Sequence, residues 1–280
     1  MLNNEQIGDY KIIEFISNMP DAEVFLASSI MDPDLYAITR YSSEIMAKKE
    51  FNIISTINPR YCIRPVSVIG NCFVTKYCEQ RSLSKLCGYL DEEYAWVVLN
   101  RVASSLEDIH SKGYVHLCIK PQSLLLDKPG DVLLGGFIKA QPNNTEVEFK
   151  DRDCFDAPEL NRQSPVATPP MDIWSLGACI FELLMGVPVF GGRGGLSQTE
   201  STPIPSFRKD KYSNELTTLI RSCLSYNPDN RPTASRICSV ATEAVLNSRK
   251  CKHRRHLKPS YISCASEASS LDYWPERMQP

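Results

Sequence analysis

One polar loop holds several of the side chains in this sequence that could do chemistry. The stretch GYVHLCIKPQSLLLD, residues 113–127, places His116, Cys118, Lys120 and Ser123 within a few positions of one another. A thiol of ordinary pKa is mostly neutral at pH 7, and its thiolate attacks electrophiles rather than accepting a hydroxyl proton. Lys120 is a cation that could meet a phosphate group, and the alternative is that it is only a charge on the loop surface.

The remaining cysteines give no sign of a metal or disulfide framework. The chain has 11 cysteines and none of them forms a C-x-x-C pair. Structural zinc sites usually draw their ligands from close pairs, so we expect reduced thiols, most of them small buried hydrophobes. No apolar run is long enough to cross a bilayer and no apolar signal segment opens the sequence, so we expect a cytoplasmic or nuclear protein.

The first part of the chain alternates in short β-rich runs and then changes to a helical rhythm. Turn-forming residues separate the runs, and Ser42 or Ser43 is suited to cap the helix. The expected strands are residues 10–16, 23–29, 35–41, 63–69 and 72–78, and the expected helix is 42–57.

The second part of the chain is mainly helical by the same criteria. The strongest helix covers residues 91–113, with an acidic first turn, an apolar stripe and a terminal glycine. Further expected elements are a short helix at 82–87, a hairpin around Pro129-Gly130, and helices at 171–186, 213–224 and 233–246. Residues 191–206 are rich in Gly, Ser, Thr and Pro and predict a mobile loop.

Five features in order resemble the eukaryotic protein kinase family over residues 9–246. They are Glu50, HLCIKP from His116, APE from Ala157, DIWSLG from Asp172 and NPDNRPTA ending at Ala234. The resemblance implies an α+β, bilobal fold. A small antiparallel β-sheet lobe with one helix would cover 9–77 and a larger, mainly helical lobe 78–246. Residues 1–8 would be an N-terminal extension, and 247–280 a basic, then Ser-rich, flexible tail.

The resemblance also assigns structural roles to several polar and apolar residues. Glu159 and Arg231 would form a buried ion pair, because the arginine fork suits a carboxylate. Asp172 would brace the backbone of the loop at His116. His116, Phe137 and Ile54 match apolar stacking positions that join the two lobes.

The phosphate-binding positions of the family are changed. Where the family has a glycine-rich loop this chain has Ser17, Met19 and Ala22, and the segment between them could equally be a plain hairpin turn. The strand lysine is replaced by Thr39. Arg40 should point to the opposite face of the strand, so Glu50 lacks its usual partner. The alternative for Glu50 is a solvated helix glutamate.

The catalytic and metal positions of the family are changed as well. Cys118 stands at the catalytic aspartate, Ser123 at the metal-binding asparagine and Gly136 at the metal-binding aspartate. Leu117 replaces the arginine that would bind a phosphorylated segment, and Asp127 and Asp131 flank a turn rather than a metal. We therefore expect no metal site and too few charged groups in the cleft to hold a metal-bound triphosphate.

These departures predict a pseudokinase, which would act as a protein-binding scaffold or an allosteric regulator, with a protein partner that is itself an active kinase. A pseudokinase requires no cofactor. Val24, Ala37 and Leu125 resemble the apolar adenine shelf of the family, so weak metal-free binding of ATP is compatible with this prediction. The alternative is an atypical ATP-dependent Ser/Thr protein kinase that uses displaced residues: Arg40, Lys120 and a nearby aspartate.

The tail suggests two further interactions. Its basic segment, residues 248–258, could bind nucleic acid or acidic lipid, although we favour a solvated linker, and the net charge of −2 gives no general attraction to either. Tyr261, Leu271, Tyr273 and Trp274 lie in a Ser-rich stretch and predict a docking peptide.

Overall fold

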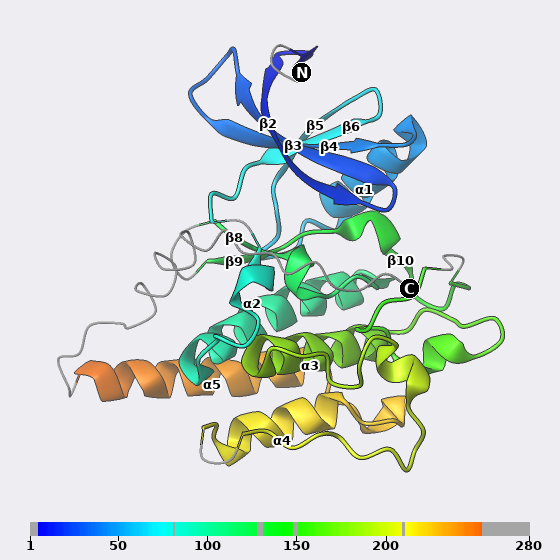
Figure 1. Cartoon of the computed structure of the whole chain (residues 1–280), viewed down its shortest axis with the longest axis vertical. Coiled ribbons are helices and arrows are strands. Elements are labelled where there is room, and N and C mark those ends of the chain that lie inside the picture. The colour runs from blue at the N-terminus through cyan, green and yellow to red at the C-terminus, as the bar shows by residue number, and fades with distance from the viewer. Residues whose placement is uncertain (1–4, 81, 128–130, 148–150, 209–210, 254–280) are drawn as a thin grey trace.

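The structure is a computed structural model that describes residues 5–80, 82–127, 131–147, 151–208 and 211–253. A twisted antiparallel sheet with one helix forms the upper part of the molecule, and the other helices form the lower part (Figure 1). This is the bilobal protein kinase fold that the sequence predicted. Among the described residues, no helix is long and apolar enough to cross a membrane.

The small lobe is a six-stranded sheet in the order β1-β2-β3-β4-β6-β5, with helix α1 (Glu44–Ile57) beside it. Its strands are β1 (Gln6–Ile7), β2 (Tyr10–Met19), β3 (Ala22–Ser29), β4 (Leu35–Tyr41), β5 (Pro65–Ile69) and β6 (Cys72–Lys76). The five predicted strands are present. One correction concerns the predicted N-terminal extension, because Gln6 and Ile7 pair with β2 and belong to the sheet.

The two faces of this sheet carry separate hydrophobic clusters because successive side chains of a strand point to opposite faces. Phe25 and Ile38 belong to an outer cluster covered by Ile7, Tyr10 and Ile69. The opposite face of the sheet turns toward α1 and joins the main core, which continues into the large lobe. Ser43 caps α1 by accepting a hydrogen bond from the backbone of Met46.

The large lobe is built around two buried helices, α2 (Glu92–Ser111) and α3 (Pro169–Met185). Helix α4 (Asn214–Cys223) packs on α3, and α5 (Ala234–His253) packs along α2 (Figure 1). Short strands complete it: β7 (Tyr114–Val115), β8 (Leu124–Leu126), β9 (Val132–Leu134) and β10 (Gln141–Pro142). The 3-10 helices are η1 (Leu83–Leu86), η2 (Pro121–Ser123), η3 (Phe137–Lys139), η4 (Pro158–Asn161), η5 (Gly194–Ser197) and η6 (Pro228–Asn230).

Two predicted boundaries in this lobe need correction. Helix α5 continues to His253, so it extends past the boundary placed after residue 246. The predicted mobile loop at 191–206 contains η5, where Gly194 and Gly195 are buried against the segment that precedes η4. The sequence favoured a loop because Gly and Pro are poor helix formers, but small residues are what this close approach requires.

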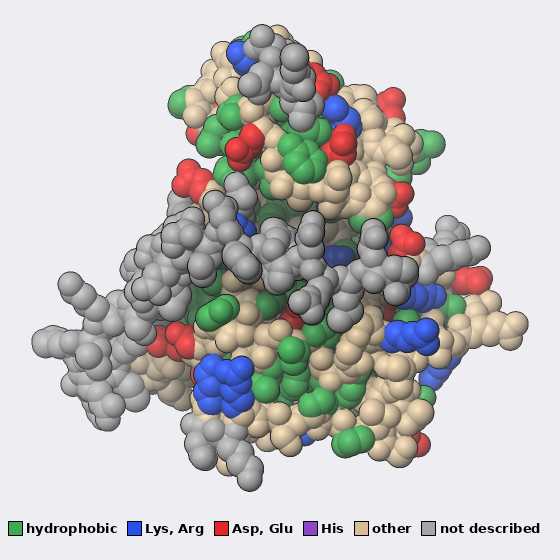
Figure 2. Space-filling model, viewed as in Figure 1, with side chains coloured by type: hydrophobic (Ala, Val, Ile, Leu, Met, Phe, Trp, Pro, Cys, Tyr) green, Lys and Arg blue, Asp and Glu red, His purple; other side chains and the backbone are tan. Residues whose placement is uncertain are grey.

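The surface carries no concentrated charge on the face seen in Figure 2, where acidic and basic side chains are dispersed among hydrophobic ones outside the grey atoms. Several apolar side chains of the small lobe are exposed, among them Ile13, Phe15, Ile30 and Met31. Single exposed apolar residues are normal on a protein surface.

Candidate functional site

The loop at His116 is held by a single buried carboxylate. Asp172 at the start of α3 is fully buried and accepts hydrogen bonds from the backbone nitrogens of His116 at 2.8 Å and Leu117 at 2.7 Å. Leu117 has a φ of 58°, a conformation that costs a non-glycine residue energy. The two hydrogen bonds stabilise this strained backbone, which confirms the bracing role predicted for Asp172.

Cys118 and Ser123 of the loop at His116 lie beside Gly136, which follows β9. The sulfur of Cys118 lies 3.8 Å from the hydroxyl of Ser123, and a Cβ added to Gly136 would lie 3.1 Å from that hydroxyl. Burial raises the pKa of the Cys118 thiol, so this thiol is protonated at neutral pH. Cys118 supplies a thiol and Ser123 a hydroxyl, and Gly136 has no side chain, so none of the three positions supplies a carboxylate.

This donor set does not fit a magnesium ion, which prefers carboxylate oxygens. Within the described ranges, no three or more His, Cys, Asp or Glu side chains are grouped so that they could hold a metal ion. Asp127 and Asp131 flank the β8–β9 hairpin, as predicted, and Asp131 lies 3.8 Å from Arg101. The tip of this hairpin, at Pro129-Gly130, lies outside the described residues.

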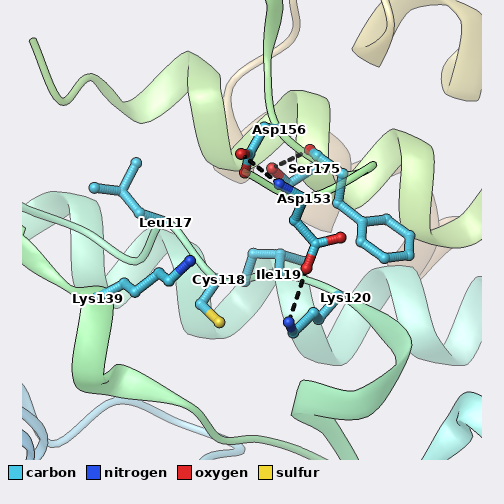
Figure 3. Close-up of a pocket in the computed structure, with 9 residues that line it drawn as sticks. Leu117, Cys118, Ile119, Lys120, Lys139, Asp153, Asp156 and Ser175 are labelled. Carbon is cyan, nitrogen blue, oxygen red and sulfur yellow. Dashed lines mark hydrogen bonds and ion pairs between the residues drawn. The ribbon is translucent and has the colours of Figure 1, made fainter. Parts of the chain in front are cut away.

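A small polar recess opens beside Cys118, and two aspartates line it (Figure 3). Lys120 forms an ion pair with Asp153 at 2.8 Å, and Asp156 accepts a hydrogen bond from the backbone nitrogen of Asp153 at 2.8 Å. Lys139 points into the same recess (Figure 3). An acidic pair beside lysines is more charge than the sequence led us to expect here, and Lys120 is paired rather than a free surface charge.

The two aspartates of the recess differ in their protonation. Burial acts to raise the pKa of Asp153, but the hydrogen bond and the charge of Lys120, together with hydrogen bonds from Cys154, outweigh it and leave this pKa lowered. Burial raises the pKa of Asp156 to about 6. Asp153 is therefore a carboxylate bound to a cation, and Asp156 is a weaker acid held by the same segment.

Glu50 of α1 is not the solvated glutamate that the sequence left open. It is only 3% exposed, and its two oxygens accept hydrogen bonds from the Tyr41 hydroxyl and from the backbone nitrogen of Phe137. The second of these bonds is 2.8 Å long. Thr39, at the lysine position, lies on the same face of β4 as Tyr41, so the hydroxyl bond comes from two residues further along the strand.

Arg40 lies on the other face of β4, as predicted from the alternation of side chains. Its guanidinium lies 4.8 Å from the ring centre of Phe25 and forms an ion pair with Glu5. It therefore belongs to the outer face of the sheet, away from Glu50.

The changed glycine-rich segment forms a close hairpin. Ser17 pairs with Val24 and Met19 with Ala22, so the chain turns at Pro20 and Asp21. This geometry agrees with the plain hairpin turn that the sequence allowed as an alternative.

The residues predicted to form an adenine shelf are half-buried. Val24 pairs with Thr39, and Ala37 lies two residues before Thr39 on β4, where it pairs with Leu26 and Thr75. Val24 and Ala37 therefore share the inner face of the sheet. Leu125 lies on β8 of the large lobe. Apolar contact with a flat ring is what these side chains can offer, and nucleotide binding stays a prediction.

The predicted structural contacts are present, both between the lobes and within the large lobe. The rings of His116 and Phe137 meet edge to face with their centres 4.6 Å apart, and Ile54 lies in the same core cluster as Phe137. Arg231 binds Glu159 through two hydrogen bonds, of 2.6 and 2.8 Å, with both side chains almost fully buried.

Sequence reasoning missed three polar residues of the site: Tyr41, Asp153 and Asp156. Tyr41 could have been found, because it follows Thr39 by two positions and must share its strand face. No spacing rule points to Asp153 and Asp156, because they reach the recess through an irregular segment. The predicted docking peptide at Tyr261, Leu271, Tyr273 and Trp274 lies outside the described residues. Residues 254–258 of the basic segment also lie outside them, while residues 248–253 fall within α5.

Comparison with known proteins agrees with this architecture. Residues 26–241 match the model of the protein kinase domain. The chain is 29% identical over 178 residues to the serine/threonine-protein kinase pim-2 of Danio rerio, which covers 62% of this chain and 56% of the relative. It is 25% identical over 256 residues to the CBL-interacting serine/threonine-protein kinase 18 of Arabidopsis thaliana, which covers 84% of this chain and 49% of the relative.

The chain spans about half the length of these curated relatives, so their whole activities do not transfer to it. The matched region nevertheless includes β4, α1, the loop at His116 and the Glu159–Arg231 pair. The chain therefore belongs to the protein kinase domain family.

Proposed function

We propose that this kinase domain is a pseudokinase, which works as a protein-binding scaffold or an allosteric regulator rather than as a phosphotransferase. The observation that carries the proposal is the cluster of Cys118, Ser123 and Gly136, which lacks a carboxylate where base and metal ligands would be needed. Losing a positioned base alone typically costs a factor of about 10²–10⁴ in rate. Groups that act as a unit are not additive, but the loss of base and metal site together leaves little capacity for turnover.

The contacts that hold the frame support a binding role. Asp172, the Glu159–Arg231 pair and the His116–Phe137 contact hold the two lobes and both ends of the activation segment, residues 137–159, without using the reaction centre. A frame held in this way can present its surface to a protein partner, and the class we propose is an active kinase. Weak metal-free binding of ATP on the shelf of Val24, Ala37 and Leu125 is compatible with this function.

The direct test is a phosphotransfer assay of the purified full chain with labelled ATP, magnesium or manganese, and generic protein substrates. We expect no transfer above that of the Cys118→Ala variant. A thermal-shift series with ATP, with and without metal, shows whether the site takes a nucleotide at all. We expect no metal-dependent shift, and robust metal-dependent transfer abolished by pocket substitutions would overturn the proposal.

A second candidate is an atypical Ser/Thr protein kinase, and one observation favours it. Asp153 places a carboxylate 2.8 Å from Lys120 in the recess beside Cys118, which returns an acidic group to the neighbourhood of the missing base. The names of the relatives, which are serine/threonine kinases, also favour this candidate. Against it stands the ion pair itself, because Lys120 binds one oxygen of Asp153 and helps to lower the pKa of this carboxyl, which makes it a weaker base.

A matched pair of variants separates the two candidates. Asp153→Asn removes the displaced carboxylate, and Asp151→Asn removes an exposed carboxylate two residues earlier in the same segment. The atypical kinase predicts transfer that is lost in the first variant and kept in the second. The pseudokinase predicts that neither variant changes the background signal.

A further inference from the structure

The contact between β4 and α1 is made by a neutral donor. Tyr41 ends β4 and Glu50 lies in the middle of α1, and both side chains are 3% exposed. The hydroxyl donates to Oε2 of Glu50, while Oε1 accepts from the backbone nitrogen of Phe137. One carboxylate thus connects the sheet, the helix and the start of the activation segment.

A buried carboxylate with no cation needs hydrogen bonds from its surroundings to remain stable. Burial raises the pKa of Glu50, and the hydrogen bonds from Tyr41 and Phe137 offset only part of this rise. Burial also raises the pKa of Tyr41, so the phenol keeps its proton and can donate it in the hydrogen bond to Glu50.

This arrangement leaves neither oxygen of Glu50 without a hydrogen-bond donor from the protein. Both oxygens of Glu50 already have a partner from the protein, on opposite sides of the carboxylate. A strand lysine would have had to share its charge between this glutamate and a nucleotide phosphate. The phenol of Tyr41 has a single proton to donate, and the hydrogen bond to Glu50 uses it.

We propose that Tyr41 replaces the strand cation and latches α1 to the sheet and to Phe137 in the absence of nucleotide. The domain would then hold α1 against the sheet and Phe137 without a ligand in the cleft. This inference goes beyond the proposed function, because it concerns the position of α1 whether or not phosphate is transferred.

The variant that tests the latch is Tyr41→Phe, and the chain offers a matched control on the same strand. Tyr36 is 4% exposed and lies on the outer face, where its hydroxyl binds Asp32 and Lys76 at the surface. Tyr36→Phe therefore removes a hydroxyl from an equally buried ring without touching Glu50.

Hydrogen exchange of the full chain without nucleotide gives the main readout. We expect Tyr41→Phe to speed the exchange of the α1 amides and of the Phe137 amide by about 10- to 100-fold, the range of a lost hydrogen bond to a charged group. We expect Tyr36→Phe to leave these amides unchanged. Equal exchange in wild type and Tyr41→Phe would overturn the proposal.

A double-mutant cycle distinguishes loss of the bond to Glu50 from a general loss of stability in Tyr41→Phe. Glu50→Gln keeps the shape of the side chain and an acceptor for Phe137, but weakens the bond from Tyr41. The Tyr41→Phe change should therefore lower the melting temperature less in the Glu50→Gln background than in the wild type. Strictly additive shifts would show that the two residues are not coupled and would refute the latch. Because no nucleotide or substrate is used, this outcome is independent of the phosphotransfer assay.

Discussion

Gly195 occupies a position in η5 that leaves no room for a side chain. A Cβ added there would lie 2.6 Å from the backbone oxygen of Asp156, 2.8 Å from Cζ2 of Trp174 and 2.9 Å from Cδ of Pro158. Carbon atoms at such distances repel strongly. The obstacles are a backbone and a fully buried indole, so neither can turn aside as a flexible side chain would. Gly195→Ala should therefore push the 191–198 segment away from the activation segment.

The size of the effect follows from the kind of contact. Adding a methyl group to a well-packed site typically costs about 1–3 kcal/mol. In a domain of this size 1 kcal/mol lowers the melting temperature by about 2–4 °C, and the backbone obstacle at Gly195 places the cost in the upper part of the range. We expect Gly195→Ala to lower the melting temperature of the full chain by about 4–10 °C, measured by calorimetry.

Gly192→Ala is the matched control, because it makes the same chemical change in the same loop. Gly192 is exposed and has no heavy atom within 4 Å of the added Cβ. Its melting temperature should stay within about 2 °C of the wild type. If the two variants have the same melting temperature, the packing of η5 against the activation segment does not stabilise this loop, and the reasoning fails.

Three further substitutions probe other buried contacts. Arg231→Met leaves Glu159 buried without a counter-charge, so the free energy of unfolding in urea should fall by about 3–5 kcal/mol. Asp172→Asn removes one of the two acceptors used by the backbone nitrogens of His116 and Leu117, which should cost about 1–3 kcal/mol in the same experiment. Burial lowers the pKa of His116 to about 4, so its contribution to stability is full above pH 6.5 and is lost as the pH falls toward 4. The whole loss is about 3 kcal/mol, and about 2 kcal/mol of it falls between pH 7.5 and pH 5, so His116→Phe should abolish about 2 kcal/mol of pH dependence when unfolding is compared at these two pH values.

Controls for these variants come from the surface and from the opposite titration. Lys48 pairs with Glu44 on the exposed side of α1, and Lys48→Ala should change stability by less than about 0.5 kcal/mol. A loss as small for Arg231→Met would contradict the buried ion pair. Asp156, whose pKa is raised to about 6, stabilises the folded state at low pH and loses this effect as the pH rises through 6. The His116 effect must therefore be taken from the difference between variant and wild type, and identical pH slopes would refute it.

The regular elements were predictable because local patterns determine them. The alternation at 23–29 and 35–41 gave β3 and β4, and the apolar stripe with an acidic first turn gave α2. The side of the strand that Arg40 takes also followed from a period of two. The end of α5 was missed because the chain after Leu246 carries no apolar stripe, yet its helix continues to His253.

For the candidate site, the sequence predicted only which catalytic and metal-binding residues of the family are missing. Residue types at fixed positions of a motif identify what is missing, so Thr39, Cys118, Ser123 and Gly136 were found without coordinates. What replaced the missing groups came from elsewhere in the chain. Asp153 is 33 residues from the lysine that it binds, and no local pattern encodes that distance.

The sequence by itself determined the family frame and the absence of a carboxylate at three reaction-centre positions, because both depend only on which residue stands at which place in a motif. Tertiary structure decided the fate of the groups that remained. It buried Glu50 under Tyr41, bound Lys120 to Asp153 and closed η5 against the activation segment. Each of these contacts depends on how far apart two segments lie after folding and on how much water is excluded between them. Neither quantity can be obtained from residue order alone.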